Sequence, residues 1–195
     1  MSIVSGEIGH LLIGVVSELH PSNPGWVRIK FPAMAQVDSD WCSVVSPMGG
    51  AGRGFVMLPE VGDNVLVGFE SGATSRGFVL GSIWNNAQKI PSGDGAPQDN
   101  NLRFIRSRSG HVIRLDDTRG SEKIEIIDKS TQQSIVIDAS KRKISITTEG
   151  GDISVTTKSG KVTIEASDIS LKSLGAIKIE ATGTLTLKGA TVNIN

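Results

Sequence analysis

The sequence predicts an all-β protein in two parts, a small barrel followed by a β-helix that several copies of the chain build together. Three observations lead to this prediction. Short apolar stretches broken by turn residues fill residues 11–83. A polar stretch rich in glycine, proline and amides covers residues 85–101. Beyond Leu102, a unit of one apolar, one variable and one apolar residue repeats through the rest of the sequence.

The first part reads as six candidate strands, and helix signals are scarce there. The candidate strands are residues 11–19, 26–31, 41–45, 55–58, 64–69 and 78–83. Proline and glycine mark the turns between them, and five or six strands of this length suit an OB-type barrel. We therefore expect an N-terminal arm at 1–10, an OB-fold barrel at 11–84 and a polar linker at 85–101.

The repeated unit of the second part places its first and third side chains on one face of a strand. The middle residues are mostly polar, so we expect one buried face and one wet face. Successive units begin between 7 and 11 residues apart, which is too irregular for the stacked corners of a single-chain solenoid. Three identical chains around one axis avoid this problem, because each level then contains the same segment three times.

These observations predict an intertwined trimeric β-helix, a triple-stranded needle over residues 102–195, built by a homotrimer. Its core would consist of the aliphatic side chains of eight units. They are Ile124, Ile126, Ile135, Ile137, Ile144, Ile146, Ile153, Val155, Val162, Ile164, Ile169, Leu171, Ile177, Ile179, Leu185 and Leu187. A ninth unit, Val192 with Ile194, follows them. A core this narrow and aliphatic leaves no ligand-sized cavity, and no cofactor is expected.

Composition argues against several functions. The chain has 20 basic and 20 acidic residues, and residues 1–101 hold five basic against nine acidic ones. A strip of Arg28, Lys30 and Phe31 on an OB barrel would suit nucleic acid, but the acidic excess argues against nucleic-acid binding. The single cysteine, Cys42, is expected to be a buried, inert thiol. No signal peptide precedes the barrel, so synthesis in the cytoplasm is expected.

Two histidine–carboxylate sets are candidate catalytic or metal-binding groups. They are His111 with Asp116 and Asp117, and His20 with Asp38 and Asp40. Neither has the spacing of a known catalytic or metal motif, so we expect no enzyme and no metal site. The pairs Thr147–Thr148 and Thr156–Thr157 lack the flat, regular ladders of an ice-binding solenoid.

The basic cluster Arg103, Arg106 and Arg108 has two open interpretations. The cluster either binds the acidic barrel of a neighbouring copy or is simply exposed to solvent.

Several stretches resemble phage baseplate assembly protein V and the matching domain of VgrG proteins. In the barrel half they are residues 25–32, 43–50, 54–69 and 79–85, and beyond the linker residues 106–118 and 122–124 resemble the opening of a VgrG-type needle. The resemblance implies a non-enzymatic central spike of a contractile injection machine. It also implies a barrel below a hub or baseplate protein and a trimeric needle that leads the tail tube through the target membrane.

The sequence departs from this family in three ways. Only about ten residues precede the barrel, so a separate hub protein is expected to connect the trimer to the tube. No lysozyme domain separates the barrel from the needle. No closely spaced histidines occur near the C-terminus, where some short spikes bind iron.

The last residues continue the repeat without a cap. We expect a PAAR-type tip protein to dock on Thr191, Val192, Asn193, Ile194 and Asn195. The alternative function is a trimeric β-helical fibre that adheres to a surface.

Overall fold

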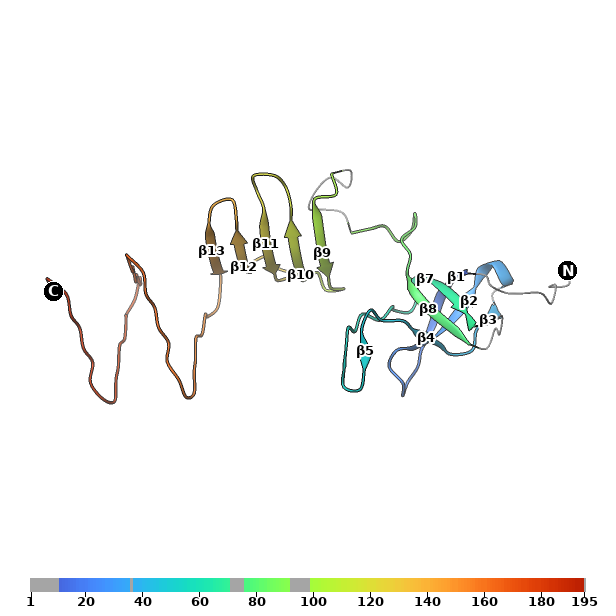
Figure 1. Ribbon diagram of the computed structural model, residues 1–195, viewed down its shortest axis with the longest axis horizontal. Coiled ribbons are helices and arrows are strands. Elements are labelled where there is room, and N and C mark those ends of the chain that lie inside the picture. Colours follow the sequence, from blue (N-terminus) through green and yellow to red (C-terminus); the bar gives the residue numbers. More distant parts are fainter. Residues whose placement is uncertain (1–10, 36, 71–75, 92–98, 195) are drawn as a thin grey trace. The chain divides into compact units, whose positions relative to one another are not determined.

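The computed structural model describes residues 11–35, 37–70, 76–91 and 99–194 (Figure 1). The described residues form β-strands and one short 3-10 helix, η1 (Pro32–Met34). No helix among them is long and apolar enough to cross a membrane. The prediction of an all-β protein is confirmed.

Five strands close a barrel in the first part of the chain. They are β1 (Leu12–Leu19), β2 (Trp26–Phe31), β4 (Cys42–Val44), β7 (Asn64–Phe69) and β8 (Gly77–Ser82). Going round the barrel, the order is β1, β2, β4, β8, β7 and back to β1, and only β4 and β8 run parallel. This is the small, closed Greek-key barrel expected of an OB fold. The barrel prediction is confirmed.

The barrel interior is built by alternation along the strands, because every second side chain points inward. The buried core consists of Val16, Val27, Ile29, Phe31, Cys42, Val65, Val67 and Val79. Gly14 belongs to the same interior: a Cβ atom there would collide with Cγ2 of Ile29 and lie 3.0 Å from the Lys30 carbonyl oxygen. Cys42 is buried as expected, and burial raises the pKa of its thiol.

Three shorter elements complete the barrel half. β3 (Val37–Asp38) pairs with the end of β2, while β5 (Gly49–Gly50) and β6 (Arg53–Gly54) form a small hairpin. The predicted strand at residues 55–58 is wrong, because these residues pair with no strand. β4 pairs directly with β8, so the barrel closes without a strand between them.

A second sheet follows in residues 102–148. It consists of β9 (Leu102–Arg106), β10 (Val112–Asp116), β11 (Lys123–Ile127), β12 (Gln133–Asp138) and β13 (Lys143–Thr148). Consecutive strands pair antiparallel, which makes an up-and-down meander (Figure 1). The first three predicted units fall inside β11, β12 and β13. In the single chain, tight hairpins rather than β-helical corners connect them.

The chain divides into two compact units at Gly150 and Gly151. Described by itself, the second unit contains no strand pairing within the chain over residues 151–194. It runs in extended stretches separated by bends at 158–160, 167, 174–175, 182–183 and 190. Three of these bends contain glycines that the sequence marks as corners, Gly160, Gly175 and Gly183. The extended stretches and their reversals can be followed in Figure 1.

Candidate functional site

One face of the meander is aliphatic from β9 to β13. Because residues directly opposite each other in a ladder share a face, the strand register defines two rows of side chains across the sheet. The first row is Ile105, Ile113, Ile126, Ile135 and Ile146, and the second is Leu115, Ile124, Ile137 and Ile144. We call these nine side chains the aliphatic face.

No other part of the described chain covers the aliphatic face. Its side chains are between 41% and 70% exposed, a high value for isoleucine and leucine in the middle of a sheet. The predicted core residues of the second unit are also exposed, by 52–77% from Ile153 to Leu187. On the meander, an exposed apolar face of this kind is typical of a protein–protein interface.

The opposite face of the meander is polar and internally bonded. Arg114 on β10 lies opposite Glu125 on β11, and its Nε and Nη2 atoms both lie 2.7 Å from Oε2 of Glu125. Lys123 Nζ lies 3.9 Å from the other carboxylate oxygen. Glu125 is only 6% exposed and is the single buried charged residue of the described chain. The pair therefore joins β10 to β11 away from bulk water.

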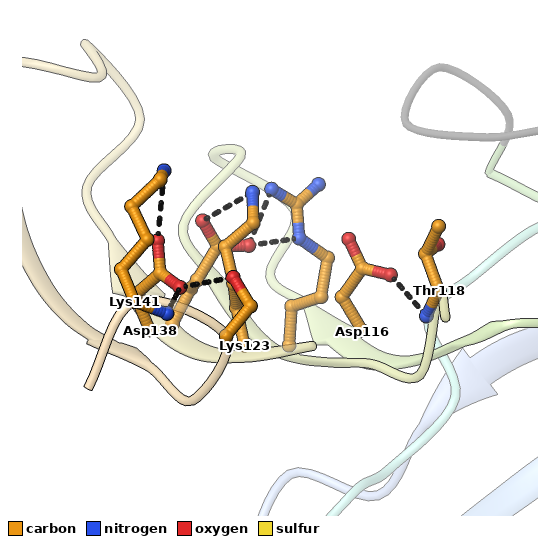
Figure 2. A network of polar contacts seen from close by, with 8 residues as sticks. Asp116, Thr118, Lys123, Asp138 and Lys141 are labelled. Carbon is orange, nitrogen blue, oxygen red and sulfur yellow. Dashed lines mark hydrogen bonds and ion pairs between the residues drawn. The ribbon is translucent and has the colours of Figure 1, made fainter. Parts of the chain in front are cut away.

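A second row on the polar face alternates in charge. The register places Asp116, Lys123, Asp138 and Lys143 side by side across β10 to β13. Opposite charges in directly facing positions favour this register over a slipped one. Figure 2 shows Lys123 and Asp138 in this network, with Lys141 bonded to Asp138 at 3.1 Å.

Aspartates also hold the hairpin turns of the meander. Asp128 accepts hydrogen bonds from the Ser130 hydroxyl and from the Ser130 and Gln133 backbone amides. Asp138 accepts bonds from the Ser140 hydroxyl and from the Lys141 backbone and side chain. These bonds, led by the serine hydroxyls, lower the pKa of each carboxyl to about 2.

Asp116 repeats the pattern at the hairpin between β10 and β11. It accepts a bond from the Thr118 backbone amide, and its pKa is lowered chiefly by its bonds with Thr118 (Figure 2). β10 and β12 thus end in an aspartate, β11 is followed directly by one, and each aspartate is followed two residues later by serine or threonine. Sequence reasoning missed this repeat, although its fixed spacing is a known signal for side-chain-capped turns.

The two histidine–carboxylate sets have structural roles in the described chain. Nδ1 of His111 accepts a hydrogen bond from the Lys129 backbone amide, and Nδ1 of His20 accepts bonds from the Ser22 and Asn23 amides. Three of their four carboxylates have partners elsewhere, and one of these is Asp38, which accepts a bond from the Ser17 hydroxyl. Asp117 forms an ion pair with Arg103. Asp40 has no recorded side-chain partner among the described residues.

Arg28, Lys30 and Phe31 do not form the nucleic-acid-binding strip that the sequence suggested. Phe31 lies in the barrel core and cannot stack on a base. Arg28 is bonded to Glu18 at 2.8 Å and lies over the Trp41 ring at 4.4 Å. Of the basic cluster, Arg103 pairs with Asp117, and Arg106 lies over the Phe104 ring.

Comparison with known proteins shows which family of domains this barrel resembles. Residues 12–84 match the family described as the type VI secretion system and phage-baseplate injector OB domain. The matched range covers the whole closed barrel, from the first residue of β1 to just past β8. The barrel is therefore similar in sequence to the OB domains of this family.

The chain is also similar to curated spike proteins of Pseudomonas aeruginosa. It is 27% identical to the type VI secretion system spike protein VgrG5 over 134 residues, which is 63% of this chain and 16% of that protein. It is 29% identical to VgrG4b over 116 residues, 55% of this chain and 14% of that protein. The resemblance to a VgrG-like baseplate spike protein is confirmed. The chain covers about a sixth of the length of these relatives.

Proposed function

We propose that this chain is the structural spike of a contractile tail or injection-system baseplate. Three copies would form a rigid, membrane-puncturing needle below a hub protein, as part of an assembled injection particle. The observation that carries the proposal is the uncovered aliphatic face on a chain that also has an injector OB domain. The action is mechanical, because a stiff trimer transmits the force of contraction to a small area of membrane.

The second unit supports assembly from several copies. Its extended stretches form no strand pairing within the chain, yet backbone N–H and C=O groups near an apolar core require partners. Two further copies supply those partners at every level, with the same sequence and therefore the same spacing. The sixteen predicted core side chains, including Ile124 and Leu187, would then turn inward as the common core.

The tip is part of the same proposal. A PAAR-type protein would dock on residues Thr191, Val192, Asn193 and Ile194, together with Asn195, which lies outside the described residues. Val192 and Ile194 are exposed by 52% and 86% and offer an apolar contact. Deletion of residues 191–195 should abolish pull-down of the PAAR-type protein of the same system, and undiminished capture would refute this docking site.

Absolute mass in solution tests the trimer. One chain weighs 20.6 kDa, so three weigh about 62 kDa, and light scattering separates the two easily. We expect the trimer mass at all concentrations that can be measured. A folded 20.6 kDa monomer would overturn the proposed needle while leaving the OB barrel in place.

A further inference from the structure

A cavity of about 270 Å³ opens at one end of the barrel. The beginning of β1 and the ends of β2 and β7 meet there, because β1 runs antiparallel to both neighbours. Leu12, Phe31, Met34 and Phe69 form its apolar wall, and Asp38 and Asp40 contribute carboxylates. We call it the barrel-end pocket.

The barrel-end pocket combines an apolar wall with two carboxylate groups. Phe31 is only 4% exposed, and the Phe31 and Phe69 rings lie 6.0 Å apart between centroids. Asp38 accepts one bond from the Ser17 hydroxyl at 3.2 Å, and Asp40 has no recorded hydrogen bond or ion pair through its side chain in the described chain. An aliphatic stem fits the wall, and a cationic head fits aromatic rings and carboxylates.

The size of the pocket limits what it can hold. Sites for drug-sized ligands and cofactors usually measure about 300–1,000 Å³. A volume of about 270 Å³ suits one long side chain better than a whole cofactor. The charge of the barrel agrees with a cationic guest, since residues 11–84 hold six acidic and four basic side chains.

None of the residues that line the pocket is cationic. Lys30 is the cross-strand partner of Asp38, but no ion pair between them is recorded in the described part of the chain. The sequence of residues 1–10 contains neither lysine nor arginine, so the segment that leads into Leu12 offers no side chain of these two types. We therefore assign the guest to another molecule.

We propose that the barrel-end pocket binds an arginine or lysine side chain presented by an extended segment of a partner protein. The alkyl stem would lie on Leu12, Met34 and Phe69, which are half-buried, and the charged head would lie between Asp38 and Asp40. This site does not depend on the needle, because every residue that lines it belongs to the barrel. It gives the barrel a specific anchor for a basic partner segment.

Methionine-methyl NMR on the full-length protein tests the proposal directly. Met34 lines the pocket, whereas Met48 and Met57 lie outside it and serve as internal references. The probes are three blocked tripeptides with leucine at both ends and arginine, lysine or glutamine in the middle. We expect saturable shifts of the Met34 methyl signal with the arginine and lysine peptides and a much weaker response with glutamine.

Two double variants separate the pocket from general electrostatics. Asp38→Asn with Asp40→Asn should weaken binding of the basic peptides about tenfold or more, as expected for loss of charge-assisted contacts. Glu18→Gln with Glu70→Gln changes the net charge equally but lies outside the pocket, and should leave binding unchanged. Unaltered Met48 and Met57 signals show that each variant is folded.

Three results would overturn the proposal. They are equal weakening by both double variants, equal binding of the glutamine peptide, and shifts at Met48 or Met57 without a shift at Met34. None of them bears on the trimer, whose mass is measured separately.

Discussion

At the scale of single residues, Glu125 shows how the meander stabilises a buried charge. A carboxylate with 8% side-chain exposure is costly unless it is paired and hydrogen-bonded, and Arg114 meets that need with two nitrogen atoms on one oxygen. The planar guanidinium suits such a contact, and a lysine in its place would not reproduce it. The pair therefore specifies which residues of β10 and β11 face each other.

Arg114→Ala should destabilise the protein by about 3 kcal/mol, because it leaves a buried carboxylate without its partner. Urea denaturation at one fixed protein concentration measures the change. Lys178→Ala is the control, since its ion pair with Glu180 at 2.8 Å is exposed on both sides. That control should cost less than about 1 kcal/mol, and equal losses in both variants would contradict a special role for Arg114.

Sequence reasoning had the right alternation but the wrong environment for Glu125. It expected the middle residue of each unit to be wet, and in the single chain Glu125 is buried while its neighbours Ile124 and Ile126 are half exposed. The main reason lies on the next strand, because Arg114 of β10 bonds the carboxylate from the same face, and Lys123, two residues before Glu125 on β11, lies 3.9 Å from it. Periodicity along one strand does not reveal which residue of the neighbouring strand lies opposite a given side chain.

At the scale of elements, the hairpins of the meander depend on charged aspartates. The hydrogen bonds that hold the Asp128 and Asp138 carboxyls favour their ionised form, which is why their pKa values fall from 3.8 to about 2. A lowered pKa in the folded state means that the stabilisation is fully present above the unfolded value. It is lost as the pH falls through the folded value.

Acid should therefore weaken these hairpins between about pH 4 and pH 2. We expect Asp128→Asn with Asp138→Asn to flatten the fall in the urea midpoint across this range while lowering the midpoint at neutral pH. Asp168→Asn is the control, because no side-chain hydrogen bond of Asp168 is recorded in the described chain. A double variant with the same acid profile as the parent would refute the role of the two turns.

The barrel strands depend on small residues at close contacts. Gly14→Ala should destabilise the barrel by about 1–3 kcal/mol, because the added methyl group collides with Ile29 and crowds a backbone oxygen. Gly81→Ala on β8 is a matched control, since a Cβ atom there meets nothing within 4 Å. Thermal unfolding followed by circular dichroism should show a clear loss for the first variant and almost none for the second.

The sequence predicted the barrel strands well and the pairing of the second half poorly. Residues 26–31 and 64–69 were predicted with their observed limits, because alternation and turn residues mark both ends. Residues 55–58 were assigned to a strand for their apolar run alone, although exposed apolar residues are common in loops. β9 and β10 were not among the predicted units, because arginines interrupt their apolar pattern.

At the scale of the whole molecule, the aliphatic face makes the oligomer testable by point mutation. Ile137→Asn places a polar group in the middle of the proposed core and should shift the mass from trimer towards monomer or aggregate. Ser145→Asn lies on the opposite face of the neighbouring strand and should keep the trimer mass. Light scattering at matched concentrations compares the two, and an unchanged trimer in Ile137→Asn would argue against this face as the core.

The repeat indicated an assembly of copies, and the single chain is consistent with that prediction without testing it. What a sequence cannot supply is the identity of the strand that lies next to each segment, because the same apolar units serve a meander, a solenoid or a trimer. Val136 illustrates the ambiguity, since its apolar side chain occupies the polar face between Glu125 and Ser145. The intertwined needle therefore stays a prediction.

The lack of strand pairing within residues 151–194 has a consequence for the time course of assembly. A segment that finds its hydrogen-bond partners only on other copies cannot complete its structure on one ribosome. In the proposed trimer, the barrel would form as each chain emerges, whereas the shaft would wait for encounters between chains. The rate of shaft formation should then rise steeply with protein concentration. Clustered translation on a single messenger RNA would keep the nascent copies close and shorten the period in which the aliphatic side chains are open to aggregation.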